Sequence, residues 1–160
     1  MKNWTELGKL EYDLLWDFVY ETLRFSPSRS NKECVLFPAD YRYYDISDFF
    51  GPGFSESLYD DLLRCTEKVF IEISKKNIMY ALDWQHECYS FDPKLPFEQD
   101  NFGESLIPIF PNGDYLFFIT KDLKNVIFAD GINRRISFCG ADLIKAYERH
   151  KPNIFIKQIH

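Results

Sequence analysis

Hydrophobic and polar positions follow two different periods along this chain, and the period changes near residue 77. Before that point, two stretches repeat apolar residues at intervals of three and four, which is the spacing of an amphipathic helix. Residues 5–24 carry one stripe and residues 55–76 carry the other. Thr5 and Ser55 stand where N-cap residues are expected, although Gly8 can delay the regular part of the first helix by a turn. The pattern therefore predicts two helices in the first half of the chain.

After residue 77, apolar residues occur in short runs rich in aromatic and β-branched side chains, which is typical of strands. The predicted strands, including an earlier one, are residues 41–46, 78–84, 87–91, 115–121, 125–129 and 135–139. Short turns at 122–124 and 130–133 predict that the last three strands form an antiparallel meander. Residues 141–150 then predict a closing helix, which Pro152 ends.

These elements predict an α+β fold in which N-terminal helices and a C-terminal helix pack on one face of a largely antiparallel sheet of about five or six strands. No repeat or linker divides the chain, so residues 1–160 are expected to form a single globular domain. Two segments lack a clear element. Residues 26–40 are typical of a surface connection, whereas the long segment 92–113 resembles loops that are functional or mobile.

Composition excludes several classes of protein. The formal net charge of -6, from 25 acidic and 19 basic residues, opposes binding to nucleic acid. No apolar run approaches the roughly 20 residues that cross a bilayer, and the first residues lack the pattern of a secretory signal. The four cysteines lie at least 23 residues apart without a C-x-x-C pair. We therefore expect reduced, buried thiols in a cytoplasmic protein.

Acidic residues gather in two segments, 40–61 and 80–104, and each segment holds six acids against one base. A surface of this charge favours a basic partner. Aromatic residues make up 18% of the chain, and large rings dominate the energetics of both cores and interfaces. The combination favours a protein that binds another protein.

The long segment 92–113 interleaves rings with acids. Its candidate partner-binding residues are Phe97, Glu98, Asp100, Phe102 and Glu104, because acids steer a basic partner and rings anchor it. A second interpretation stays open at this point. The two phenylalanines can instead fold back over the sheet, with the acids serving only to keep the loop soluble.

Asp83, His86 and Glu87 form a second candidate cluster, because carboxylates and histidine carry protons and bind metals. These three residues support an alternative hypothesis, in which the protein is a small hydrolase or transferase. We nevertheless expect no metal site, since His86 is the only histidine outside the last eleven residues. Strand alternation would also send Asp83 and His86 to opposite faces.

Other catalytic chemistry finds little support. Cys88 lies close to His86 but in an acidic stretch, which disfavours a reactive thiolate. No glycine motif for binding phosphate occurs. Asn112-Gly113-Asp114 is typical of a turn that starts a strand, and the alternative is a carboxylate placed at the rim of a pocket. We assign no catalytic residue and expect no cofactor.

Several short motifs carry a resemblance to a known family. They are Phe25-x-Pro-Ser, Tyr44-Asp45-Ile46-Ser47, Leu82-Asp83-Trp84-Gln85-His86, Tyr89-x-Phe-Asp-Pro and Phe110-Pro-Asn-Gly-Asp-Tyr. With them, nearly the whole chain resembles a small bacterial family named as domain of unknown function 2716. The resemblance implies no known activity and no established catalytic residues.

The expected architecture is also similar, more loosely, to the SMI1/KNR4-like immunity proteins of bacterial toxin systems. Gly113-Asp114 leads into a strand, a hairpin follows, and a helix closes the chain. Members of that group bind and neutralise toxins, often nucleases. This similarity implies a non-enzymatic, immunity-like module whose partner is a basic protein such as a toxin. It leaves the oligomeric state open.

Overall fold

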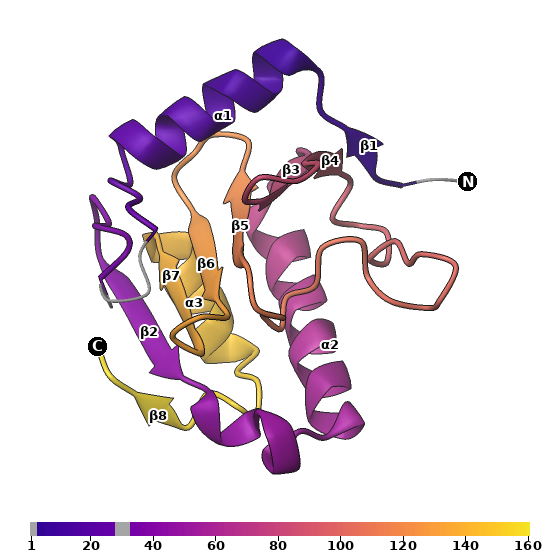
Figure 1. Cartoon of the computed structure of the whole chain (residues 1–160), viewed down its shortest axis with the longest axis vertical. Helices are drawn as coiled ribbons and strands as arrows, with labels where there is room; N and C mark the ends of the chain where they lie inside the picture. Colours follow the sequence, from indigo (N-terminus) through magenta and orange to yellow (C-terminus); the bar gives the residue numbers. More distant parts are fainter. Residues whose placement is uncertain (1–2, 28–32) are drawn as a thin grey trace.

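The computed structural model describes residues 3–27 and 33–160 (Figure 1). Its helices, among these residues, are α1 (Lys9–Glu21), α2 (Glu56–Ile73) and α3 (Ala141–Arg149), with the 3-10 turns η1 (Ser47–Phe49) and η2 (Gly51–Gly53) before α2. Helices and an antiparallel sheet together confirm the α+β class. Residues 28–32 of the predicted surface connection lie outside the described residues.

The sheet has eight strands in the described chain, in the order β1-β4-β3-β5-β6-β7-β2-β8. The strands are β1 (Thr5–Glu6), β2 (Tyr41–Asp45), β3 (Met79–Asp83), β4 (Tyr89–Phe91), β5 (Tyr115–Thr120), β6 (Val126–Asp130), β7 (Arg135–Cys139) and β8 (Lys157–Gln158). Every pairing is antiparallel, and the β5-β6-β7 meander is confirmed. The predicted number of strands was too low because β1 and β8, at the two edges, have only two residues each. Strands that short carry no visible alternation.

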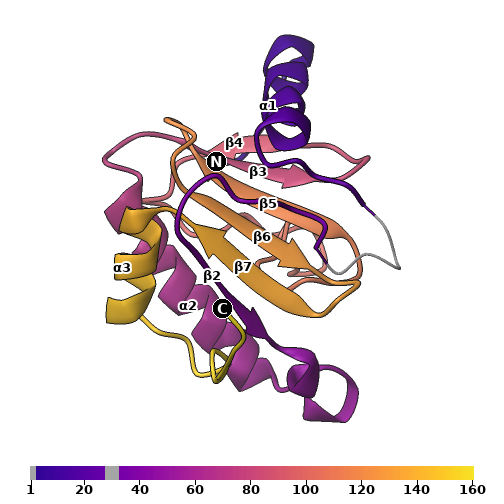
Figure 2. The same cartoon turned by 90° about the vertical axis from the view of Figure 1, so that its left-hand side faces the viewer.

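Both faces of the sheet are covered, which corrects the prediction that all helices pack on one face. Helices α2 and α3 cover one face and α1 lies on the other (Figure 2). Strand β5 is buried at every position. Leu116 and Phe118 belong to the cluster with α2, while Phe117 and Ile119 belong to the cluster with α1. An uninterrupted apolar run is typical of a strand that is covered on both sides.

Helix α1 begins at Lys9, directly after Gly8, which agrees with the delay expected at that glycine. Thr5 is not its N-cap, because it pairs in β1 with Ser90 of β4. The Leu7 N–H donates to the carbonyl oxygen of Cys88 at 2.8 Å, which continues this edge pairing. Gly8 becomes the N-cap. Sheet pairing thus overrides the local helical preference of this stretch.

The structure bears on two expectations from composition, namely buried thiols and the lack of a segment that crosses a membrane. All four cysteines are free, and three of them, Cys34, Cys88 and Cys139, are buried, while Cys65 is partly buried. Within the described residues, no helix combines the length and the hydrophobicity that crossing a membrane requires.

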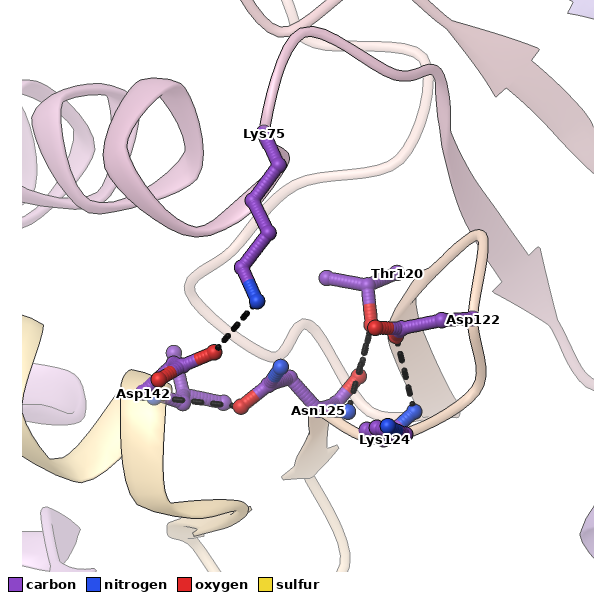
Figure 3. A network of polar contacts seen from close by, with 7 residues as sticks. Lys75, Thr120, Asp122, Lys124, Asn125 and Asp142 are labelled. Atoms are coloured by element: carbon purple, nitrogen blue, oxygen red, sulfur yellow. Dashed lines mark hydrogen bonds and ion pairs between the residues drawn. The ribbon is translucent and has the colours of Figure 1, made fainter.

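The turn between β5 and β6 caps the start of helix α3 (Figure 3). Buried Asn125 accepts the backbone N–H of Leu143 through its Oδ1 atom at 3.1 Å. It replaces the side-chain cap that Gly140, the N-cap residue of α3, cannot supply. The Thr120 hydroxyl in turn accepts the Asn125 N–H at 3.2 Å. A single buried amide from the sheet therefore caps the first turn of the helix.

We expect Asp122, in this turn, to contribute a pH-dependent part of the stability. Burial would raise its pKa, but hydrogen bonds from Thr120 Oγ1 at 2.7 Å and the Lys124 N–H at 3.0 Å, with the charges of Lys124 and Lys75, hold the pKa below 3.8. A carboxylate whose pKa falls on folding stabilises the native state above its unfolded pKa, and this contribution is lost as the pH falls through the folded pKa.

The Asp122→Asn variant measures that contribution. Because Asp122 is exposed, the variant should lose less than about 1 kcal/mol of unfolding free energy at neutral pH. The difference from the wild type should approach zero in strong acid, where both states of the wild type are protonated. Urea unfolding at the two pH values tests this, and a difference independent of pH would contradict it.

Candidate functional site

Phe97, a predicted partner-binding residue, lies in the core, which corrects its expected place on an outward surface. Only 7% of it is exposed. Its ring contacts Trp4, Phe91, Phe70 and Phe118, with centroid separations of 5.4 to 6.0 Å. Aromatic pairs at such separations stabilise the core beyond the burial of their surface area. The open alternative of a phenylalanine folded back over the sheet holds for Phe97.

Glu98 and Asp100 hold the chain in place. Glu98 Oε1 accepts the backbone N–H of Asn3 at 2.7 Å and that of Trp4 at 3.4 Å, which ties the N-terminal segment to the loop. Asp100 Oδ1 accepts the N–H groups of Phe102 at 2.8 Å and Glu104 at 3.1 Å, which shapes a tight turn. Both carboxylates therefore have structural roles.

Phe102 and Glu104 face solvent, as does Asp100 in the same turn. Phe102 is 89% exposed at the tip of the turn. Glu104 is exposed on the side of the turn that borders a large cleft. The loop that carries them protrudes beside α2 (Figure 1). The structure thus divides the five predicted residues between the core, the turn and the surface.

The cleft beside Glu104 has a volume of about 890 Å³. Its walls come from Phe50 and Phe54, which flank η2, and from the first turns of α2, the segment 103–113 and the β6-β7 turn. Four rings line it, namely Phe50, Phe54, Tyr59 and Phe110. Phe110 is central, with centroids 4.8 Å from Phe50, 5.7 Å from Phe54 and 6.2 Å from Tyr59. The cleft therefore has a continuous aromatic wall.

The charged groups of the cleft are mostly acidic. Glu56, Asp60 and Glu104 line it together with one basic residue, Arg134. The Arg134 guanidinium lies 4.9 Å from the centroid of the Phe50 ring, which is a cation–π contact. Burial raises the pKa of the Tyr59 phenol, although a hydrogen bond with Ser105 partly opposes this rise. The phenol stays neutral at physiological pH.

Two glycines fix the floor of the cleft. A Cβ atom on Gly131 would lie 2.4 Å from the backbone nitrogen of Gly113, so only glycine permits this approach of the β6-β7 turn to the segment before β5. The Gly131 N–H also donates to the carbonyl oxygen of Asp114 at 3.2 Å. The shape of the cleft at this point therefore depends on direct contact between the backbone at Gly131 and the backbone at Gly113 and Asp114.

The second predicted cluster is rearranged by a turn. Gln85 adopts a positive φ of 66°, and the His86 N–H donates to the Asp83 carbonyl oxygen at 3.1 Å. The chain reverses, so His86 lies over Asp83 and not on the opposite face, as strand alternation had predicted. Its Nδ1 atom is 3.2 Å from Asp83 Oδ1 and 3.9 Å from Oδ2 of Asp114. Glu87 is exposed and is not part of this group.

These neighbours shift the pKa values of the pair. Burial raises the pKa of Asp83, partly offset by the hydrogen bond and charge of His86, while the nearby Asp114 charge adds to the rise. The pKa of His86 is raised, chiefly by its hydrogen bond with Asp83 and by the charge of that carboxylate. The histidine therefore carries a positive charge over a wider range of pH than an isolated imidazole.

Cys88 does not join this group as a nucleophile. It is buried, and its thiol donates to the carbonyl oxygens of Asp83 and His86. Burial raises its pKa above the ordinary value, which lowers the fraction of thiolate. The expectation that Cys88 is not activated agrees with these contacts.

The cleft and the contact of Asp114 with His86 were missed because each depends on distant segments. The acidic segments 40–61 and 80–104 are visible in the sequence, but no local pattern indicates that they meet. Glu56 and Asp60 come from the first segment, and Glu104 comes from the second. The Gly113-Asp114 dipeptide marked the start of a strand without indicating its neighbour. Long-range pairing of β3 with β5 brings Asp114 beside Asp83 and His86.

Comparisons with known proteins identify relatives without an assigned activity. A family model described as "Protein of unknown function (DUF2716)" matches residues 6–144. The chain is 33% identical over 160 residues to "Uncharacterized protein YxiI" of Bacillus subtilis (strain 168), and the match covers 97% of this chain and 98% of the relative. No solved structure matches significantly. The predicted resemblance to this family is confirmed, whereas the similarity to SMI1/KNR4-like proteins stays a prediction.

Proposed function

Since the chain belongs to the DUF2716 family, whose description names no activity, we propose from its own surface that it is a non-enzymatic protein that binds a basic segment of a partner protein. The proposed binding site is the aromatic cleft between the residues that flank η2, the start of α2 and the segment 103–113. The observation that carries this proposal is the convergence of both acidic segments on one aromatic cleft.

Charge supports a basic ligand. Three carboxylates, on Glu56, Asp60 and Glu104, face the cleft against the single guanidinium of Arg134. Clefts that are lined by one sign of charge concentrate the field and attract ligands of the opposite sign. All three carboxylates are exposed, so they act mainly on the rate of association and on the choice of partner.

The rings support a ligand side chain that is both cationic and flat. Arg134 already stacks on Phe50 in the protein itself. Phe54, about half exposed, and the neighbouring Phe110 offer further ring surface to an incoming guanidinium. Arginine residues of partners are frequent in such contacts because the guanidinium is planar and weakly hydrated.

The partner class extends to protein toxins. An immunity-like protein must hold a basic enzyme tightly, and an acidic, ring-lined cleft suits that task because electrostatic steering and aromatic anchors act together. This extension rests on the architectural similarity to SMI1/KNR4-like proteins and on the charge of the cleft. The binding proposal itself needs only a basic partner.

A labelled peptide tests the proposal. The probe is a fluorescein-labelled peptide in which arginines alternate with leucines, and its counterpart carries neutral citrulline in place of every arginine. We expect the arginine peptide to bind in fluorescence anisotropy and the citrulline peptide to bind at least tenfold more weakly. In the Glu56→Lys/Glu104→Lys variant, affinity for the arginine peptide should fall at least tenfold, about 1.4 kcal/mol.

A matched variant distinguishes the effect of the cleft carboxylates on peptide affinity from the effect of net charge. Asp17→Lys/Glu21→Lys changes the net charge by the same amount on the exposed face of α1, and its affinity should stay within twofold of the wild type. Equal losses in both variants would reduce the effect to net charge and contradict the proposed cleft. An arginine peptide that does not bind the wild type would also contradict it.

A further inference from the structure

Three side chains that commonly bind metals converge at the end of β3, at a place separate from the aromatic cleft function proposed above. Asp83 ends β3, His86 lies in the following turn, and Asp114 precedes β5. Each offers one ligand atom, and these atoms lie within 4.8 Å of one another. We propose that Asp83, His86 and Asp114 bind a divalent transition-metal ion such as Zn²⁺ or Mn²⁺.

The distances suit one shared ion. Metal bonds of about 2.1 Å place neighbouring ligand atoms roughly 3 to 3.5 Å apart around a tetrahedral or octahedral ion. His86 Nδ1 and Asp83 Oδ1 are separated by 3.2 Å, and His86 Nδ1 and Asp114 Oδ2 by 3.9 Å. Since the Asp114 side chain is 49% exposed, a small rotation of its carboxylate closes the remaining gap.

The backbone holds the three positions together before any ion binds. The Trp84 N–H, next to Asp83, donates to the carbonyl oxygen of Tyr115, next to Asp114, at 3.1 Å. Asp83 itself pairs with Leu116 across β3 and β5. Ligands on paired strands and a tight turn lose little conformational entropy when they close on an ion.

Charge around the cluster is consistent with a bound cation. Among the described residues, the ion pairs of Asp83 and Asp114 are both made to His86, and neither carboxylate pairs with lysine or arginine. Two carboxylates thus share one imidazole. A divalent ion would balance both carboxylates and would leave the imidazole as a neutral ligand.

The ligand set selects the class of metal. One imidazole nitrogen with two carboxylate oxygens suits Zn²⁺ and Mn²⁺, whereas Mg²⁺ prefers oxygen ligands alone. Three protein ligands leave further coordination positions for water, because His86 and Asp114 are each about half exposed. No metal site was predicted here because strand alternation placed Asp83 and His86 apart and because no second histidine is nearby in the sequence.

Titration calorimetry with Zn²⁺, on the reduced full chain, tests the site. We expect one Zn²⁺ to bind the wild type, with an affinity that falls at least tenfold in His86→Asn and in Asp114→Asn. The controls are Glu87→Gln, which removes a neighbouring exposed carboxylate, and His150→Asn, which removes a distant histidine. Both controls should stay within twofold of the wild type.

Paramagnetic Mn²⁺ locates the ion independently of zinc binding to thiols. In amide NMR spectra of the wild type, Mn²⁺ should broaden the signals of residues 83–86 and 113–115 first. Circular dichroism verifies that each variant is folded. Equal losses in the control variants, or broadening centred elsewhere, would overturn the proposal. Failure of peptide binding at the cleft would leave it unaffected, because the two experiments probe different residues.

Discussion

Replacing Phe97 by alanine is expected to lower the free energy of unfolding by about 3–5 kcal/mol, the cost of a large cavity in a packed aromatic core. Phe97 lies between Trp4, Phe70 and Phe118, and its 7% exposure leaves almost no surface for a partner. Phe102, five residues along the same loop, is 89% exposed. The Phe102→Ala change should therefore cost less than about 0.5 kcal/mol.

Urea unfolding of the two variants distinguishes core from surface within one loop. The pair is matched, since each variant removes the same ring from the same segment. A stable Phe97→Ala variant that lost binding to the arginine peptide would restore Phe97 as a surface anchor. A strongly destabilised Phe102→Ala variant would show that the tip of the loop packs against the domain.

Replacing Gly140 by alanine is expected to destabilise the protein by about 3 kcal/mol or more, through backbone strain and steric overlap together. Gly140 has a φ of +119°, which side chains other than glycine rarely adopt. A Cβ atom there would lie 2.3 Å from Asn125 Oδ1 and 2.6 Å from the Lys124 carbonyl oxygen. The change would therefore disrupt the amide that caps α3.

Gly8→Ala is the matched control, because Gly8 is also a helix N-cap. It has a φ of -70°, and nothing lies within 4 Å of an added Cβ atom. We expect this variant to lose less than about 1 kcal/mol. Thermal unfolding of both variants measures the difference. Equal losses would mean that the surroundings of Gly140 do not constrain it.

Adding Asn125→Ala separates the two causes at Gly140. Alone, the loss of the Asn125 cap should cost about 1–2 kcal/mol. In the double variant the amide can no longer overlap with the new methyl group. The loss of unfolding free energy in the double variant should therefore be smaller than the sum of the two single losses. Additive losses would assign the whole effect of Gly140→Ala to the backbone and to Lys124.

Local pattern was a good guide to the inner elements of the fold. The clean stripe after Ser55 predicted α2, and the aromatic runs with short turns predicted the meander of β5, β6 and β7. The pattern was a poorer guide where long-range pairing decides the structure. Thr5 was predicted to begin a helix, but it joins β4 at the sheet edge. Which face of the sheet α1 covers and which face α2 covers also could not be predicted. An amphipathic stripe indicates only that one side of a helix is buried.

The candidate sites divide in the same way. The sequence by itself determined the supply of acids and rings, the antiparallel class of the sheet and the absence of local metal or phosphate motifs. Only the tertiary structure decided that Phe97 is buried, that Glu56 and Glu104 border one cleft, and that Asp114 lies beside His86. The reason is physical: helix and strand periods arise between residues that are close in sequence, whereas a cleft or a metal site depends on contacts between segments that only the folded sheet brings together.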